Sequence, residues 1–420
     1  MSGALEIRHG TVSIGRMACT HAEYAYIGEI ITPLATSAPS LVAVQYARST
    51  NGAAPPPFLE VSLPEGHMKR EMLSRLAGRG EPEDFALLRA VGGNMIGLIQ
   101  VTDSSAIAQP KIDGLQLGIT QTLQMEERGL VDLAFDVRGD WPGVSGGFIK
   151  FFVTSPAASP SERNRHWIVK LADGDRPGLC AVEHFGMYAA RVMGLEVPET
   201  IVSNEFSRYM IERFDLDSRG EQLGFVDMCA ISGLPARDKY ASSAERIVRM
   251  LEAACDSTTI ASKLDTFFAQ YLLATVIRNG DAHLKNFGLL YGKAHPTAIS
   301  PVYDMLSMAV YAPKRNDGDA GDGMALTLNG TKRWPSRAML DDLARRCGMS
   351  PSRQLLWEDR MQCALVRVGV AAAMATIDNA VDDGTRAAIG RMLELWAFGV
   401  CPYSAAAAKE VVRCSALALS

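Results

Sequence analysis

Residues 279–292 read NGDAHLKNFGLLYG, and the stretch ISPVYDMLS follows at 299–307. The first stretch places Asn286 five residues after Asp281, directly behind an apolar helical pattern. In phosphoryl-transfer enzymes a loop with this spacing lets the aspartate accept a hydroxyl proton while the asparagine holds a magnesium ion. Both side chains must reach the same phosphate from one tight loop, so the spacing is informative.

A further carboxylate, Asp304, lies 18 residues beyond Asn286, after the apolar run FGLLYG and a turn. Magnesium prefers hard oxygen ligands, so Asn286 and Asp304 are the predicted metal ligands. The three residues could also be a helix cap, a turn residue and an unrelated acid, because Asp and Asn usually occur at caps and turns. Their combination around one short strand favours a shared site.

Two basic residues lie inside the loop. We expect His283 to orient the Asp281 carboxylate and Lys285 to neutralise charge in the transition state. Zinc is not expected, because no other histidine lies at metal-ligand spacing from His283.

The upstream half of the site is predicted around Lys170, which lies in the apolar strand pattern HWIVKLADGD. A strand lysine of this kind grips the phosphates of ATP in kinases and is oriented by a helix glutamate, here Glu183. Alternatively, Lys170 is a charge on an edge strand and Glu183 is a first-turn helix acid.

The segment GVSGGFIKFF (143–152) is the predicted phosphate loop. Glycine-rich backbone at Gly146 and Gly147 can expose N–H groups to phosphates, with Ser145 beside them and Lys150 adding charge. A hairpin turn is the alternative. Downstream, RYMIERFD ends at Glu212 and Phe214, where backbone groups could pair with adenine.

The patterns predict an α+β protein with a β-rich module at 1–125, a small α/β lobe at 126–215 and a larger, mostly helical lobe at 216–420. The predicted strands are LEIRHGTVSIG (5–15), AYIGEII (25–31), LVAVQYA (41–47), VDLAFDV (131–137), FIKFFV (148–153), WIVKL (167–171) and RYMIERF (208–214). The predicted helices are KREMLSRLAG (69–78) and PEDFALLRAVG (82–92), each closed by a glycine, then AVEHFGMYAARVMG (181–194), DTFFAQYLLATVIRN (265–279) and PSRAMLDDLARRCG (335–348).

Composition narrows the class of protein. The formal net charge of −5 argues against tight, unaided binding to nucleic acid. Eight cysteines are scattered without a CxxC pair, which disfavours a zinc ribbon or a thioredoxin-like site. The apolar stretches at 270–277 and 368–377 are too short to span a bilayer, and no secretory signal is expected, so the cytoplasm is the predicted compartment.

Taken together, these motifs resemble the HipA family of bacterial serine/threonine kinase toxins over nearly the full length of the chain. The segments that carry the resemblance are SLPEGHMKREMLSRLA (62–77), FALLRAVGG (85–93), GVSGGFIK (143–150), WIVKL, VEHF through GLEVPE (182–199), IERFD (211–215), NGDAHLKNF (279–287) and PVYDMLS (301–307). The string from Asn279 to Asn286 together with YDMLS is highly specific.

The resemblance implies a HipA-like kinase fold that uses ATP and Mg²⁺. It implies that Asp281 is the catalytic base, that Asn286 and Asp304 bind Mg²⁺ and that Lys170 binds phosphate, with adenine held by two further residues, Glu212 and Phe214. It also implies a protein substrate (aminoacyl-tRNA synthetases in known relatives), growth arrest, and a helix-turn-helix antitoxin partner through which DNA is bound only indirectly.

The chain departs from the family in the phosphate loop. Phe148 and Ile149 stand where the family usually has Gln-Pro, and Gly143 aligns with the serine that the family most often autophosphorylates. Ser145 aligns with a second serine seen in some members, which makes it the candidate for autophosphorylation here.

Two other classes of function remain open at this stage. Small-molecule kinases of the aminoglycoside or choline kinase type share the G-D-x-x-x-x-N loop, although the SLPEG module and the Y-D-M segment favour HipA. A catalytically dead binding module that acts as a corepressor with an antitoxin is the other alternative, and the intact Lys170, Asp281, Asn286 and Asp304 argue against it.

Overall fold

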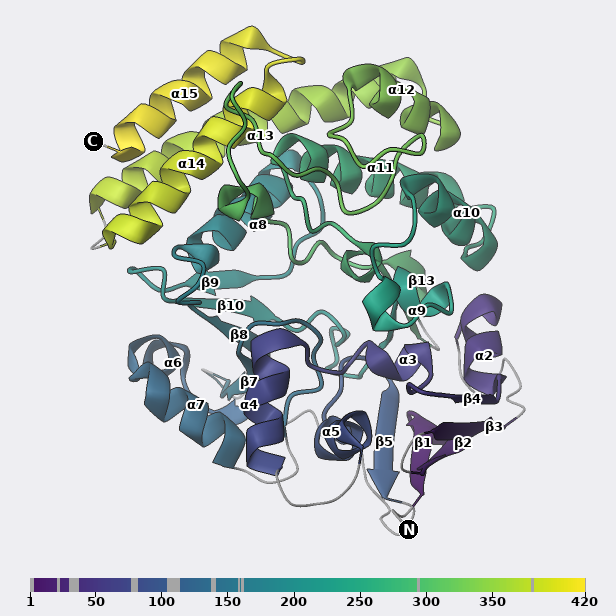
Figure 1. Ribbon diagram of the computed structural model, residues 1–420. Helices are drawn as coiled ribbons and strands as arrows, with labels where there is room; N and C mark the ends of the chain where they lie inside the picture. Colours follow the sequence, from purple (N-terminus) through teal and green to yellow (C-terminus); the bar gives the residue numbers. More distant parts are fainter. Residues whose placement is uncertain are drawn as a thin grey trace. The chain divides into compact units, whose positions relative to one another are not determined.

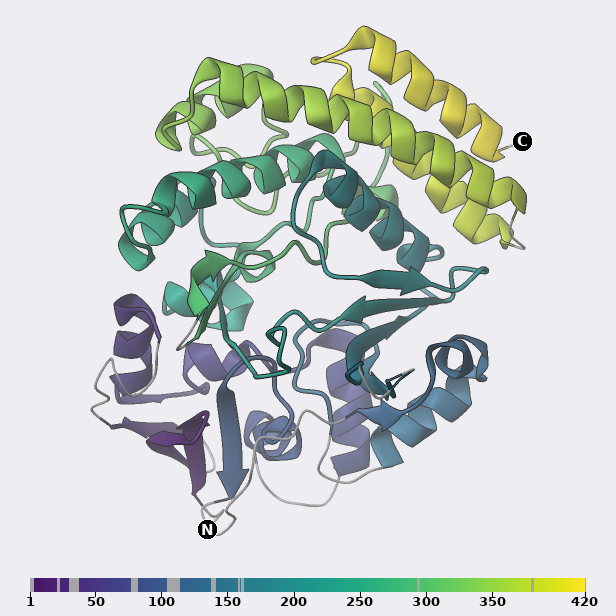
Figure 2. The same ribbon diagram turned by 180° about the vertical axis from the view of Figure 1, so that it is seen from behind.

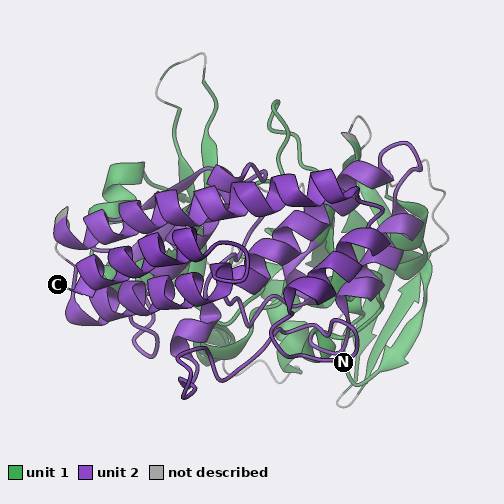
Figure 3. Cartoon of the chain, turned by 90° about the horizontal axis from the view of Figure 1, so that it is seen from above, with its two compact units in different colours: residues 1–171, 210–239, 288–300 green, residues 172–209, 240–287, 301–420 purple. Residues whose placement is uncertain are grey.

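The computed structural model describes residues 4–20, 23–29, 38–76, 82–103, 114–136, 141–157, 159, 162–292, 295–378 and 381–419. The chain divides into two compact units, shown in different colours in Figure 3. Unit 1 comprises residues 1–171, 210–239 and 288–300. Unit 2 comprises residues 172–209, 240–287 and 301–420.

Unit 1 begins with an antiparallel sheet of strand order β4-β3-β2-β1-β5 (Figure 1). Its strands are β1 (Leu5–His9), β2 (Val12–Cys19), β3 (Tyr24–Gly28), β4 (Thr50–Gly52) and β5 (Ile99–Asp103). The burial of β1 alternates with period two, as expected for a sheet with one face on a core. The segment predicted as a strand at 5–15 is extended as expected, but a turn at residues 10 and 11 divides it into β1 and the start of β2. The strand predicted at 25–31 is confirmed up to Gly28, and residues 30 and 31 lie outside the described part.

Two segments predicted as strands are helices. LVAVQYA lies in α2 (Ser40–Ala47), and VDLAFD lies in α7 (Glu127–Asp136). Val42 and Tyr46 are buried in α2, and Leu130 and Ala134 are buried in α7, which in both cases is the i, i+4 spacing of a helix face. Short apolar runs do not distinguish a strand from a buried helix by periodicity, and this ambiguity caused both errors.

The remaining helices of unit 1 include α3 (Pro57–Glu60), α4 (Gly66–Leu76), α5 (Glu83–Val91), α6 (Ile119–Gln124) and α9 (Met228–Ile231), with a 3₁₀ turn η1 (Ala236–Asp238). The helices predicted at 69–78 and 82–92 are confirmed as α4 and α5. Gly92 follows α5 in right-handed conformation, with φ −62°, so it is not a left-handed cap. Gly78, the other predicted cap, lies outside the described residues.

A second sheet has the order β6-β7-β8-β10-β9, and the boundary between the units falls within β10. Its strands are β6 (Leu115–Gln116), β7 (Lys150–Ser155), β8 (Arg165–Leu171), β9 (Thr200–Val202) and β10 (Arg208–Glu212). Strands β7, β8 and β10 confirm the three strands predicted in the small lobe. A third, antiparallel sheet in unit 1 joins β11 (Gly224–Asp227), β12 (Gly288–Gly292) and β13 (His295–Ile299).

Unit 2 is mainly helical. Its helices are α8 (Leu179–Met193), α10 (Ala244–Ala254), α11 (Ile260–Val276), α12 (Arg337–Arg346), α13 (Pro351–Asp378), α14 (Asp383–Val400) and α15 (Ala405–Leu419), with 3₁₀ turns η2 (Leu284–Asn286) and η3 (Met308–Tyr311). The predicted helices at 181–194, 265–279 and 335–348 are confirmed as α8, α11 and α12. Gly194 caps α8 in the left-handed region, with φ 94°.

The long helix α13 packs against α8, α14 and α15, and Figure 2 shows it running beside α14 and α15. Its residues Pro351–Ile377 would be long and apolar enough to cross a membrane by length and composition alone. One such helix is weak evidence of a membrane span, because the core helix of a water-soluble protein passes the same test. The stretch 368–377, predicted to be too short to span a bilayer, is part of this longer helix. All eight cysteines are free thiols.

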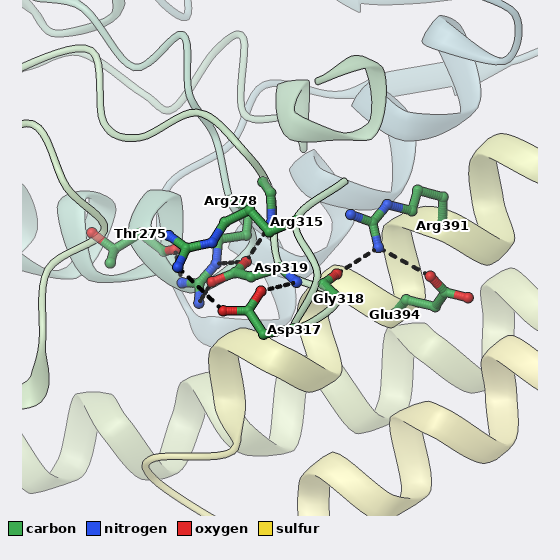
Figure 4. Close-up of polar contacts among 9 residues, drawn as sticks. Thr275, Arg278, Arg315, Asp317, Gly318, Asp319, Arg391 and Glu394 are labelled. Atoms are coloured by element: carbon green, nitrogen blue, oxygen red, sulfur yellow. Dashed lines mark hydrogen bonds and ion pairs between the residues drawn. The ribbon is translucent and has the colours of Figure 1, made fainter. Parts of the chain in front are cut away.

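The end of α11 is fixed by a buried ion pair. Arg278 adopts a left-handed backbone conformation (φ 61°), which is unfavourable for a side chain of this size. Its guanidinium donates two hydrogen bonds to the Asp319 carboxylate, at 2.9 and 3.0 Å, and a third to the carbonyl of Thr275 at 3.0 Å (Figure 4). The chain therefore leaves α11 in one fixed direction.

We predict that Asp319→Asn strongly destabilises unit 2. Removing one charge of a buried pair leaves the Arg278 guanidinium without its counterion, which typically costs about 3–5 kcal/mol. The free energy of unfolding in urea measures this cost. The control is Asp317→Asn, because the neighbouring Arg315–Asp317 pair is more than half exposed on the arginine side and should contribute less than about 1 kcal/mol. Equal effects of the two variants would contradict the prediction.

Candidate functional site

The predicted catalytic loop begins directly after Arg278, in unit 2. Asn279 accepts a hydrogen bond from the backbone N–H of Asp281 through its side-chain oxygen, at 3.2 Å. Its side-chain nitrogen donates to the backbone carbonyl of Asp304 at 3.3 Å. A single asparagine therefore joins the catalytic loop to the segment that carries the second predicted metal ligand.

A second link runs between the same two segments. The Tyr303 hydroxyl donates to the carbonyl of Lys285 at 2.7 Å. Asp304 itself has φ 50°, in the left-handed region that non-glycine residues rarely adopt. Such strain persists only where the surrounding structure imposes it, and it is concentrated at functional sites.

Helix α8 packs against the segment that carries Asp304. Gly186 lies against the backbone of Met305 and Leu306, so closely that a Cβ on Gly186 would overlap the Met305 carbonyl. Glu183 is buried in the second turn of the same helix. This position excludes the interpretation of Glu183 as a first-turn acid that stabilises the helix dipole.

The two predicted magnesium ligands supply oxygen donors of the kind that this ion requires. The Asn286 side-chain oxygen accepts a hydrogen bond from the backbone N–H of His283 at 2.9 Å, which fixes the amide orientation and leaves a second lone pair. Among the described residues no group of three or more His, Cys, Asp or Glu is arranged to hold a metal. A site built from one Asp and one Asn fits magnesium, which keeps several waters and binds substrate phosphates.

His283 was expected to orient the Asp281 carboxylate. The structure places His283 Nε2 4.0 Å from Asp281 Oδ2, beyond hydrogen-bond distance. The direct donor is instead Tyr240, whose hydroxyl lies 2.6 Å from Asp281 Oδ1. Tyr240 is 41 residues away in the chain, in a polar segment that carries no motif, so sequence analysis did not single it out.

Another carboxylate beside the loop was also missed. Asp322 lies so close to Gly280 that a Cβ on this glycine would be 2.5 Å from Asp322 Oδ2. Desolvation, with the nearby Asp319 carboxylate adding to it, raises the pKa of Asp322. In the sequence this residue belongs to NDGDAGDG (316–323), which is typical of a turn and gives no sign of its neighbour.

In unit 1 the two predicted phosphate lysines face each other. Lys150 on β7 and Lys170 on β8 are directly paired positions of an antiparallel ladder, and both are buried. Because β8 is an inner strand of its sheet, Lys170 is not an edge-strand charge. Two ammonium groups on directly paired positions of neighbouring strands place positive charge on the same face of the sheet. This is a placement in which both could contact one anion.

The glycine loop is not a hairpin turn. Gly143 forms an isolated β-bridge with Met95, and Gly146 forms one with Pro64. Both partners of the loop therefore come from the first part of unit 1. The amide of Glu65 donates to the carbonyl of Gly146 at 3.0 Å. Gly146 has φ 120°, and a Cβ there would overlap the Lys150 ammonium. Only glycine fits this position.

Ser145, in the same loop, is held by a carboxylate. Its hydroxyl donates to Glu65 Oε1 at 3.2 Å, and the other oxygen of Glu65 accepts from Lys239 Nζ at 2.7 Å. Lys150 in turn donates to the Ser145 carbonyl. The SLPEG segment, which helped to suggest the family, thus supplies the residue that holds the predicted phosphate loop.

At the predicted adenine position, Glu212 forms a paired ion bridge with Arg165 at 2.7 and 3.1 Å, and Phe214 packs edge-on against Phe225 at 5.5 Å. Because both carboxylate oxygens of Glu212 bind Arg165, the backbone of Glu212 is the group that could form hydrogen bonds with adenine. A cavity of about 150 Å³ adjoins Glu212 and is lined by Arg163, Asn164, His166, Glu212, Arg213, Leu216, Arg219 and Gly220.

Two family models match the sequence. One, described as the HipA N-terminal domain, matches residues 5–102, and the other, described as the HipA-like C-terminal domain, matches residues 143–376. The second model alone spans more than half of the chain.

Curated relatives and a solved structure agree with these matches. The chain is 28% identical over 307 residues to "Putative kinase Y4dM" of Sinorhizobium fredii, covering 69% of each chain. It is 27% identical over 281 residues to "Putative kinase Y4mE" of the same organism, covering 61% of this chain and 64% of the relative. A chain from the solved Shewanella oneidensis MR-1 complex of HipA, HipB and operator DNA superposes with a TM-score of 0.64 at 18% identity, covering 97% of this chain and 99% of that one. At this identity the likeness shows a shared fold.

We predict that Gly186→Ala displaces the segment that carries Asp304. The added methyl group must push Met305 away from α8, because its place is taken by backbone, which cannot rotate aside as a side chain can. Hydrogen–deuterium exchange of the peptide spanning 301–310 should become faster. Gly174→Ala is the matched control, since a Cβ at Gly174 meets open space. Unchanged exchange in Gly186→Ala would show that the segment is not held by this contact.

Proposed function

The chain belongs to the HipA-like family, and from that premise we propose that it is an ATP- and magnesium-dependent serine/threonine protein kinase that acts as the toxin of a toxin–antitoxin system. The observation that carries the proposal is the double link from the Asp281–Asn286 loop to the Asp304 segment, through Asn279 and Tyr303. It gives the loop and this segment the association that a phosphoryl-transfer centre requires.

In the proposed reaction a serine or threonine hydroxyl of the substrate attacks the γ-phosphorus of ATP. Asp281 accepts the hydroxyl proton as the new oxygen–phosphorus bond forms, and the bond to the β-phosphate bridging oxygen breaks, releasing ADP. Bound magnesium neutralises charge on the phosphates. Asn286 and Asp304 would hold it, and Lys285 adds positive charge at the loop.

Lys150 and Lys170 bind the ATP phosphates in this proposal, with Glu183 orienting Lys170. The loop from Ser145 to Gly147 covers the phosphates, and the backbone at Glu212 and Phe214 receives adenine. Their placement on facing strand positions makes the two lysines a natural pair for a polyanion.

The proposed partners follow from the same family. The substrate is a cellular protein, with aminoacyl-tRNA synthetases as the class known from relatives, and its phosphorylation arrests growth. The second partner is a helix-turn-helix antitoxin, and the net charge of −5 fits a chain that reaches DNA only through such a partner. The cytoplasm is the proposed compartment.

We predict that Asp281→Asn and Asp304→Asn each lower phosphate transfer by a factor on the order of 10²–10⁴, because positioning and charge neutralisation supply most of the catalysis. Transfer from radiolabelled ATP to lysate proteins, followed by phosphoamino-acid analysis, measures it. Lys170→Ala should instead weaken the binding of a non-hydrolysable ATP analogue by roughly 10- to 100-fold, the typical worth of a hydrogen bond to a charged group.

The control for Lys170→Ala is Lys409→Ala, which removes an exposed lysine of α15. Near-wild-type transfer by either aspartate variant would refute their assigned roles. Transfer to small hydroxyl compounds but not to protein would favour the small-molecule kinase, and ATP binding without any transfer would favour the corepressor.

We also predict autophosphorylation at Ser145. A phosphate there would add nearly two negative charges beside the Glu65 carboxylate, which accepts a hydrogen bond from the unmodified Ser145 hydroxyl. Repulsion should then release the loop and weaken ATP binding. Mass spectrometry after incubation with Mg-ATP tests this prediction, with Ser145→Ala as the control. Modification at another residue, or none in an active enzyme, would exclude Ser145 from regulation.

A further inference from the structure

A side chain that donates a hydrogen bond to Asp281, at 2.6 Å, comes from outside every motif of the family resemblance. Tyr240 lies in the segment that precedes α10, in the same unit as the catalytic loop. The short distance is typical of an O–H group that donates to an ionised carboxylate, which is among the stronger hydrogen bonds in proteins. The contact joins the proposed catalytic base to a second, independent piece of backbone.

Tyr240 is held in place on three sides. Its ring packs edge-on against His283, with ring centres 5.2 Å apart. Lys332 Nζ donates to the Tyr240 carbonyl at 3.1 Å, and the ammonium lies 5.8 Å from the ring centre. Two residues further on, the carbonyl of Ser242 accepts from the amide of Thr327 at 3.1 Å.

These contacts are not those of a core residue. Tyr240 is 38% exposed, which is well above the exposure of the core aromatic residues. His283, expected to orient Asp281, instead supports the ring of Tyr240, while its Nε2 stays 4.0 Å from the carboxylate. The hydroxyl of Tyr240 is thus directed to Asp281 by a scaffold with no other evident purpose.

We propose that Tyr240 is a positioning residue for the catalytic base, an inference that rests on the proposed kinase function. A carboxylate has about four lone-pair sites on two oxygens, so it can accept from a phenol and from a substrate hydroxyl together. The phenol occupies Oδ1 and fixes the rotation of the carboxylate. Oδ2 is then presented to the substrate hydroxyl. His283 acts indirectly, because its ring packs against the phenol ring of Tyr240 and sets its position.

The test is Tyr240→Phe, which removes the hydroxyl and keeps the ring against His283. ADP release from Mg-ATP, with water and the chain's own hydroxyl groups as acceptors, gives kcat and KM. We expect kcat to fall roughly 10- to 100-fold, the usual range for losing a hydrogen bond to a charged group, with KM for ATP unchanged. The matched control is Tyr311→Phe, which removes a hydroxyl that donates to the Pro177 carbonyl at 3.0 Å.

A double-mutant cycle with Asp281→Asn separates positioning from general support of the fold. If Tyr240 acts through Asp281, adding Tyr240→Phe to Asp281→Asn should lower the residual rate no further. Three results would overturn the inference: losses of rate that add in the double variant, a fall in kcat that a lower melting temperature of Tyr240→Phe accounts for, or an unchanged kcat in Tyr240→Phe. A faster Tyr240→Phe enzyme would show that the phenol blocks the base, which also overturns it.

The two proposals fail in different ways. A wild-type chain that binds Mg-ATP but releases no ADP would refute the kinase function and this inference with it. A wild-type chain that turns over ATP, combined with an unaffected Tyr240→Phe variant, would refute only the role of Tyr240.

Discussion

The buried pair between Arg278 and Asp319 is the constraint on which the proposed catalytic loop depends. A left-handed arginine at the end of α11 is costly, and two charge-assisted hydrogen bonds to Asp319, with a third to the Thr275 carbonyl, hold it there. The next residue, Asn279, then reaches both Asp281 and Asp304. The geometry of the site thus originates in a loop, 313–321, that carries no catalytic residue.

The sequence was sufficient to predict the motif residues but not the residues from other parts of the chain that contact them. Asp281, Asn286 and Asp304 stand out because their chemistry and spacing are unusual, whereas Tyr240, Glu65 and Asp322 are ordinary residues made important by contacts 40 to 80 positions away. For secondary structure, glycine-capped helices such as α8 were predicted correctly. The errors at α2 and α7 arose where short apolar runs are compatible with both a strand and a helix.

The first part of unit 1 contacts the proposed phosphate loop directly. Backbone bonds from Glu65 and Met68 reach Gly146 and Gly147, and the Glu65 side chain holds the Ser145 hydroxyl. These contacts hold the loop from outside, next to Phe148 and Ile149. A glycine-rich loop is flexible by itself, because glycine restricts the backbone least. Contacts from another segment are therefore needed to keep its amides in one arrangement.

The facing lysines of β7 and β8 have a consequence for how such a chain would drift over evolutionary time. Lys150 and Lys170 are opposed and buried, and in the proposed function both serve a polyanionic ligand. In a descendant released from nucleotide binding, selection for that ligand would no longer maintain either lysine, and substitutions at these two buried positions would be free to accumulate. Loss of one member of this pair would therefore be an early genomic mark of a lineage that has abandoned catalysis.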